Sequence, residues 1–114
     1  MFATEDDAGE PTRDEIDRLD GPVVLEFGAS WCPHCRALAP QLARLLKDRP
    51  DVRHIKVEDG PGRRLGRSFR VKLWPNLVFL NDGQVARQLA RPDISEVRDA
   101  LALIAGPNPR SESP

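Results

Sequence analysis

Apolar residues recur along the chain with two different spacings, and these spacings predict the order of the structural elements. Nearly continuous apolar runs over residues 23–27 and 77–80 are typical of strands buried on both faces. Leucines at helical spacing predict a helix over residues 32–48, with Pro40 expected to kink it. Weaker patterns predict the remaining elements: a helix of about two turns after Thr12, a strand over 52–57, a short helix over 65–69, a strand over 85–89 and a helix over 94–104.

Capping signals and composition mark the limits of the folded region. A capping box predicts where the first and last helices begin. The two boxes are Thr12 with Glu15 and Asp93 with Glu96. Residues 1–11 are acidic, and residues 106–114 are polar and rich in proline. We therefore expect one domain over residues 12–105, between a disordered lead-in over 1–11 and a flexible tail over 106–114.

The last two strands are predicted to form a hairpin, because residues 81–83 are Asn-Asp-Gly. In the second of these strands, Val85 and Leu89 are expected to face the core while Arg87 faces solvent. The helix between the first two strands makes their connection a crossover, so these strands should be parallel. The predicted fold class is α/β: a three-layer sandwich with a mixed central sheet of about four strands flanked by helices.

Composition argues against several classes of partner. The chain has 17 Lys and Arg against 18 Asp and Glu, a formal net charge of -1, so we expect no nucleic-acid or membrane-surface binding. Apolar runs are too short to span a bilayer. The acidic start lacks the features of a secretory signal, so we expect a cytoplasmic protein. We also expect a monomer. In that compartment a cysteine pair is more often catalytic than structural.

Cys32 and Cys35, the two cysteines of the chain, fall where a predicted strand meets a predicted helix. A Cys-X-X-Cys at this position indicates a redox site that needs no bound cofactor beyond its own Cys32–Cys35 disulfide. A structural disulfide or an inert pair is the alternative, but so short a loop would stabilise the fold little. A zinc site would need four ligands, and only His34 and His54 are available besides the cysteines, so we expect no metal.

The element order and several separate motifs resemble the thioredoxin family over roughly residues 12–105. The matching motifs are the active-site turn at residues 29–35, the helix proline Pro40, the Trp74-Pro75 loop and the hairpin at 81–83. The resemblance implies exchange of dithiol and disulfide with protein substrates. It also implies an electron donor, either a flavin reductase or another thiol protein.

Three positions depart from the pattern of thioredoxin itself. Pro33-His34 resembles the dipeptide of the bacterial periplasmic disulfide oxidase, which implies a more oxidising site. Glu26 stands where thioredoxin has Asp, as in protein disulfide isomerases, and Trp74 is larger than the residue usual before the proline. No strand is evident before the first helix, so the sheet is expected to lack the N-terminal edge strand of thioredoxin.

The resemblance implies a role for each residue of the cysteine motif and for one carboxylate. Cys32 would attack the substrate disulfide, and Cys35, more buried, would resolve the mixed disulfide. His34 would carry positive charge near the Cys32 sulfur, or would merely be an exposed polar residue. Glu26 would be a buried proton acceptor for Cys35, or a surface-facing strand residue. Its partner would be His54 or Lys56, which lie two residues apart on one face of a strand.

The same resemblance implies a substrate surface made of Trp31, Trp74 and Pro75. Pro75 would be cis, with Trp74 presenting its backbone to an extended substrate. A trans proline that opens a strand, and tryptophans that are partly core, are the alternatives. Four arginines near the third helix indicate a solvated face or, less simply, a surface for an acidic partner. These are Arg63, Arg64, Arg67 and Arg70.

The sequence is compatible with three functions, because the same residues would catalyse dithiol–disulfide exchange in both directions. The first is a thiol-disulfide oxidoreductase more oxidising than thioredoxin. The second is a disulfide oxidase or isomerase, favoured by the sequence Cys-Pro-His-Cys at residues 32–35. The third is a thioredoxin-fold adaptor that binds proteins without catalysis.

Overall fold

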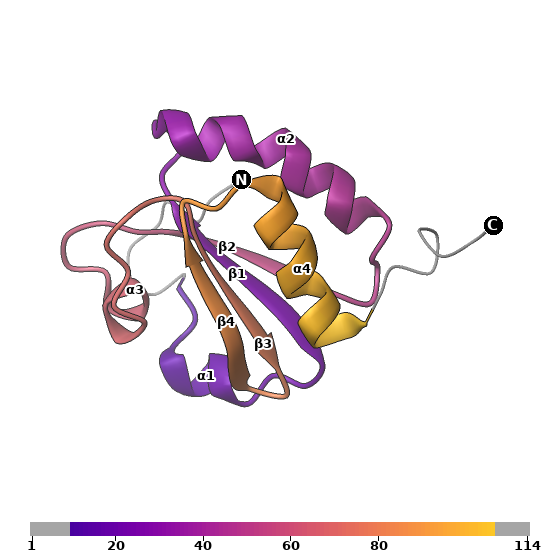
Figure 1. Ribbon diagram of the computed structural model, residues 1–114. Helices are drawn as coiled ribbons and strands as arrows, with labels where there is room; N and C mark the ends of the chain where they lie inside the picture. The colour runs from indigo at the N-terminus through magenta and orange to yellow at the C-terminus, as the bar shows by residue number, and fades with distance from the viewer. Residues whose placement is uncertain (1–9, 107–114) are drawn as a thin grey trace.

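The computed structural model describes residues 10–106, and its elements follow in the predicted order. They are α1 (Arg13–Asp17), β1 (Pro22–Gly28), α2 (Pro33–Lys47), β2 (Arg53–Glu58), α3 (Arg64–Ser68), β3 (Asn76–Asn81), β4 (Gln84–Ala90) and α4 (Ile94–Ala105) (Figure 1). Most of the predicted lead-in and tail lies outside the described residues. Of the lead-in, Glu10 is described, and its carboxylate accepts a hydrogen bond from the backbone of Leu65.

The four strands form one mixed sheet in the order β2-β1-β3-β4. β1 runs parallel to β2 and antiparallel to β3, and β3 pairs antiparallel with β4. The parallel pair confirms the predicted crossover through α2. Among residues 10–106, no strand precedes α1, so β2 and β4 form the two edges of the described sheet.

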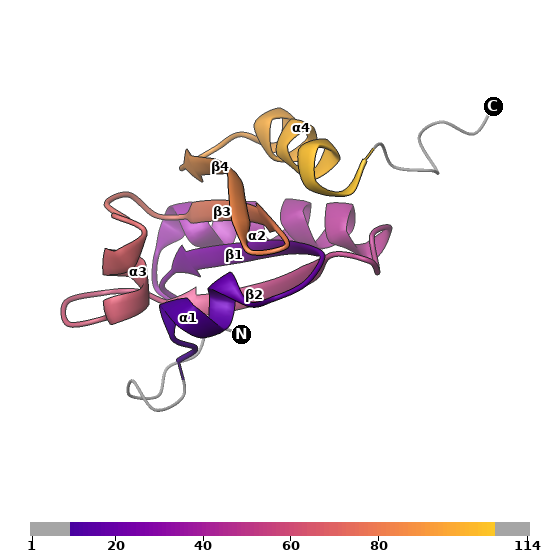
Figure 2. The ribbon, with the colours of Figure 1, turned by 90° about the horizontal axis from the view of Figure 1, so that it is seen from below.

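Both faces of the sheet are covered by helices, which confirms the predicted α/β sandwich. The apolar face beneath α2 and α4 contains Val24, Leu38, Leu42, Val52, Leu77, Phe79, Val97, Ala100, Leu101 and Ile104. The opposite face, beneath α1 and α3, contains Ile16, Val23, Leu25, Phe27, Val57, Leu65, Phe69, Val78 and Leu80. Figure 2 shows α4 and α1 on opposite sides of the sheet. Because β1 and β3 are buried on both faces, they read as continuous apolar runs.

The predicted alternation along β4 is wrong. The register pairs Leu89 with Leu77 and Arg87 with Phe79, but then shifts and pairs Val85 with Leu80. Directly opposed residues share a face of the sheet, so Arg87 lies on the same face as Leu89, and Val85 lies on the other. Arg87 shares a face with Leu89 because residues two apart in a regular strand point the same way, so the expected position of Arg87 was wrong even without a bulge. A bulge moves Val85 to the other face, since one extra residue in one strand reverses the alternation beyond it. Val85 is therefore exposed and outside the core.

The capping boxes and the hairpin form as predicted. Both boxes have the reciprocal hydrogen bonds expected of them. In the hairpin, Asp82 and Gly83 have φ values of 52° and 78°, as a two-residue turn between twisted strands requires. α1 has five residues and is shorter than the predicted two turns, and the hairpin packs against its end. A Cβ on Gly83 would lie 2.0 Å from the carbonyl oxygen of Asp17.

A buried arginine joins the end of α2 to the end of α4. Arg49 is 5% exposed, and its guanidinium donates hydrogen bonds to the carbonyl oxygens of Ala105 and Gly106. It also forms a two-pronged ion pair with Asp51, at 3.2 and 3.0 Å. Arg49 thus satisfies the last carbonyl groups of α4 with a positive charge at the negative end of the helix dipole.

We expect Arg49→Ala to lower the free energy of unfolding by about 2 kcal/mol, because it removes charge-assisted hydrogen bonds from a buried site. Chemical denaturation of both proteins measures this difference. The matched control is Arg44→Ala, which removes an exposed arginine from α2 and should change stability by less than about 0.5 kcal/mol. Equal effects of the two substitutions would contradict the role assigned to Arg49.

Candidate active site

The cysteine pair lies where β1 turns into α2. Cys32 is the N-cap of α2, with extended backbone, and Pro33 is the first residue of the helix. Proline suits this position because its φ is preset for the helix and its missing N–H would have no partner there. The Cys32 sulfur accepts a hydrogen bond from the backbone N–H of Cys35 at 3.3 Å. The helix N-terminus therefore stabilises negative charge on this sulfur.

Both cysteines are buried. Cys32 is 4% exposed and Cys35 is 1% exposed, so Cys35 is the more buried, as predicted, but only slightly. Burial raises the pKa of the Cys35 thiol to about 12, assisted by its hydrogen bond with Cys32 and by the nearby charges of Cys32 and Glu26, and opposed by the backbone of Ala29. Cys35 consequently keeps its proton at neutral pH, and a base must remove it before this sulfur can act as a nucleophile.

Glu26 is fully buried in β1, so the surface-facing alternative is wrong. Its Oε1 lies 2.7 Å from Nε2 of His54, whose side chain is 23% exposed. Its Oε2 has no hydrogen-bond partner among the described residues. Lys56, the other predicted partner, lies opposite Glu26 in the register of β1 and β2. His54 thus contacts both the buried carboxylate and solvent.

The two tryptophans lie side by side next to the cysteines. Trp31 is 68% exposed, so it is not part of the core, and its ring meets that of Trp74 edge-on with centroids 5.5 Å apart. Trp74 is half-buried and packs against Ala29, Cys32 and Cys35. The peptide bond between Trp74 and Pro75 is cis.

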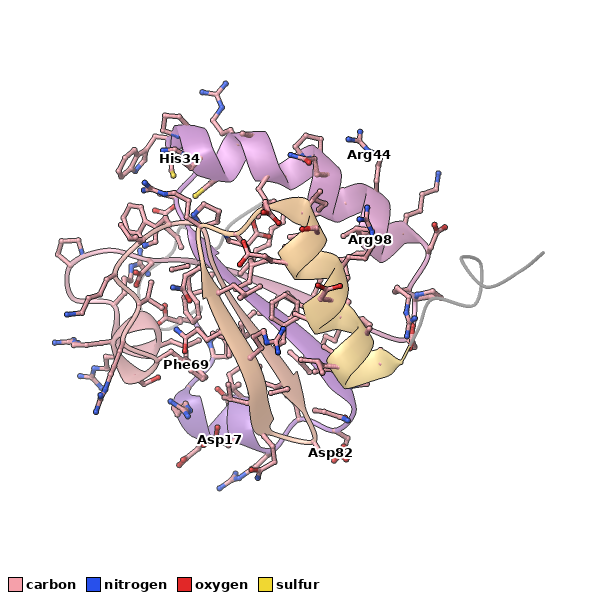
Figure 3. The ribbon with its side chains drawn as sticks, in the orientation of Figure 1. Asp17, His34, Arg44, Phe69, Asp82 and Arg98 are labelled. Carbon is pink, nitrogen blue, oxygen red and sulfur yellow. The ribbon has the colours of Figure 1, made fainter. Side chains whose placement is uncertain are left out.

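His34 is exposed on the first turn of α2, and Figure 3 shows it beside the two sulfur atoms. It lines a groove of about 370 Å³ next to the cysteines, together with Gln41, Pro75, Arg91 and Ile94. Among the described residues, no three His, Cys, Asp or Glu side chains are grouped closely enough to bind a metal ion. No helix in that part of the chain is both long and apolar enough to cross a membrane.

Two contacts of Trp74 were not predicted from the sequence. The indole N–H of Trp74 donates to the carboxylate of Asp59 at 2.9 Å, and Nε of Arg91 donates to the Trp74 carbonyl oxygen at 2.8 Å. Asp59 follows β2 and Arg91 follows β4, so no local pattern relates either residue to Trp74. The predicted arginines at 64, 67 and 70 are exposed around α3 and do not join the site.

Two cysteines with this arrangement can form and break a disulfide with little movement, since one sulfur already faces the backbone of the other residue. A helix N-cap cysteine, a buried second thiol and an apolar rim on an α/β sandwich define the class of thiol-disulfide oxidoreductases. The family model for thioredoxin matches residues 7–102. The chain belongs to the thioredoxin family, which confirms the resemblance seen in its motifs.

Individual relatives agree with this assignment. Thioredoxin Asp f 28 of Aspergillus fumigatus is 30% identical over 75% of this chain and 80% of its own length. An H-type thioredoxin of Ricinus communis is 32% identical over 72% of this chain and 70% of its own. Among solved structures, reduced thioredoxin 2 from Pseudomonas aeruginosa PAO1 superimposes with a TM-score of 0.77, at 51% identity, over 92% of this chain and 94% of that one.

Proposed function

We propose that this thioredoxin-type oxidoreductase reduces disulfides in protein substrates, with Cys32 as the nucleophile. The hydrogen bond from the Cys35 N–H to the Cys32 sulfur supports this assignment most directly. In the first step the Cys32 thiolate attacks one sulfur of the substrate disulfide. A mixed disulfide between Cys32 and the substrate forms, and the other substrate sulfur leaves as a thiolate.

The second step resolves the mixed disulfide and needs a base. Cys35 loses its proton to Glu26, and its sulfur attacks the Cys32 sulfur. The Cys32–Cys35 disulfide forms, the second substrate thiolate leaves, and two electrons have passed to the substrate. The raised pKa of Cys35 and the burial of Glu26 support this division of roles. His54 would return the proton from Glu26 to solvent, and a thiol or flavin reductase would reduce the protein again.

The surroundings of the site support a protein substrate. Trp31 and Trp74 offer an apolar surface beside Cys32, suited to an extended or unfolded polypeptide. Pro75 lines the adjoining groove. We also propose that the protein acts in the cytoplasm, because reducing compartments return such a pair to the dithiol form between turnovers. The proposed active form is a monomer.

Reduction of insulin by the wild type, with dithiothreitol as electron source, should exceed the background rate. Cys32→Ser should return the rate to background, because the nucleophile is lost. Cys35→Ser should instead accumulate a mixed disulfide with the substrate, which mass spectrometry detects. If Cys32→Ser retained the wild-type rate, a binding adaptor rather than an oxidoreductase would be indicated.

Glu26→Gln should slow the resolving step by about 10- to 100-fold while leaving the attack by Cys32 unchanged, because Gln cannot accept the Cys35 proton. Rapid quenching of the reaction with a peptide disulfide measures both steps. Glu96→Gln is the matched control, since Gln serves equally well in the capping box of α4. Equal resolving rates in wild type and Glu26→Gln would rule out Glu26 as the proton acceptor.

We further propose that the site is more oxidising than that of thioredoxin, and Pro33-His34 is the observation that favours this. A positive charge on His34 would stabilise the Cys32 thiolate and hence the reduced form, which raises the reduction potential. An oxidase or isomerase activity is the second candidate function, and it would follow from a sufficiently high potential.

Equilibration with glutathione buffers should give a potential between about -270 mV, typical of thioredoxin, and about -120 mV, typical of the periplasmic oxidase. His34→Ala should lower it by about 30 mV or more, equivalent to about 1.4 kcal/mol. Arg44→Ala, which removes an exposed charge further along α2, should leave the potential unchanged. A wild-type potential near -270 mV would contradict the proposal.

A further inference from the structure

Trp74 is held at two of its polar groups by side chains from distant parts of the chain. Asp59 accepts from the indole N–H, and Arg91 donates to the backbone carbonyl oxygen. The carbonyl oxygen is the acceptor that an extended substrate would use if it paired with Trp74 as an additional strand. In this structure that oxygen already accepts from Arg91, which uses one of its two lone pairs.

Asp59 is itself fixed in place. The backbone N–H of Asp59 donates to the carbonyl oxygen of Gly28 at 2.8 Å. The Asp59 Oδ1 packs against Gly66 of α3, where no Cβ would fit. The indole ring is therefore held by an anchored carboxylate on one side and by the cysteines on the other. Trp74 is thus held in a fixed position, and Arg91 is hydrogen-bonded to it.

Arg91 adopts an unusual backbone conformation to reach Trp74. Its φ is 50°, in the left-handed region that a residue with a side chain rarely adopts. Its backbone N–H donates to the Pro75 carbonyl oxygen at 2.7 Å, and its Nε donates to that of Trp74. Its two terminal nitrogens make no hydrogen bond to residues 10–106. An exposed guanidinium with two free N–H edges therefore lies beside the residue that packs on Cys32.

The hydrogen bonds around the groove leave the terminal nitrogens of Arg91 for an acidic ligand. Arg91 and His34 line the same groove. Asp93 is the one carboxylate among its lining residues, and it is already used to cap α4. Hydrogen bonds from the backbone of Glu96 and from the side chain of Ser95 hold the pKa of Asp93 below its usual range. The lowered pKa keeps Asp93 ionised, but its Oδ1 accepts from the Glu96 N–H and the Ser95 hydroxyl, and Asp93 makes no hydrogen bond to Arg91 within residues 10–106.

We propose that Arg91 selects protein substrates that carry an Asp or Glu next to the reactive cysteine. The inference rests on the proposed disulfide exchange at Cys32. A carboxylate beside the substrate sulfur accepts two hydrogen bonds from the terminal nitrogens, while Nε stays on Trp74 and keeps the guanidinium oriented. Recognition by this side chain adds to any main-chain hydrogen bond that a substrate makes at the second lone pair of the Trp74 carbonyl oxygen.

The test uses two peptide disulfides that differ only beside the reactive cysteine, with Glu on both sides in one and Gln in the other. The second-order rate constant for each is measured with reduced protein and divided by the rate constant with dithiothreitol, which removes the effect of Glu on the disulfide itself. The readout is the ratio of the acidic to the neutral peptide within each protein. A loss of folded protein therefore does not change it.

The wild type should prefer the acidic peptide by about fivefold, as expected for one exposed charge pair, and added salt should reduce the preference. Arg91→Gln should bring the ratio to about one. Arg98→Gln, which removes an exposed arginine from α4 outside the groove (Figure 3), should keep the wild-type ratio. A ratio near one in the wild type, or equal ratios in wild type and Arg91→Gln, would overturn the proposal. Failure of Cys32-dependent reduction of the neutral peptide would instead overturn the proposed function.

Discussion

The parallel register between β1 and β2 decides which side chains reach the active site. It places Val24 opposite His54, Glu26 opposite Lys56 and Gly28 opposite Glu58. Because side chains alternate along a strand, His54 then shares a face with Glu26 and reaches its carboxylate. Asp59 follows Glu58 at the end of β2. Its backbone N–H donates to the Gly28 carbonyl oxygen, and its carboxylate accepts from the indole N–H of Trp74. A slip of one residue would send His54 to the opposite face of the sheet.

This register is itself set by burial on both sides of the sheet. β1 contributes Val24 to the face beneath α2 and α4, and it contributes Val23, Leu25 and Phe27 to the face beneath α1 and α3. Glu26 is the polar exception, and a buried carboxylate is tolerated only where partners compensate its desolvation. An apolar residue at position 26 would avoid this desolvation cost. The costly residue at this position is consistent with a chemical role for the carboxylate at Cys35.

Much of the fold could be predicted from local signals. The apolar runs of β1 and β3, the leucine repeat of α2, both capping boxes and the Asn-Asp-Gly hairpin each act over a few residues, and each led to a correct element. The alternation expected along β4 failed for two reasons. Arg87 and Leu89 are two residues apart and share a face in any regular strand, and the bulge that moves Val85 depends on the pairing of two strands and leaves no mark in one of them. Arg49 was overlooked for a similar reason. An arginine after a helix is normally exposed, and only the approach of the α4 terminus buries it.

The sequence by itself determined the cysteine pair at a strand-to-helix junction, the neighbouring tryptophans and the family to which the chain belongs. These features lie within short segments, so residue types and spacing suffice to define them. Only the tertiary structure decided that His54 contacts Glu26 and that Asp59 and Arg91 hold Trp74. Those contacts join residues 15 to 28 positions apart in the chain, and they exist because the sheet and its loops bring the ends of three strands together.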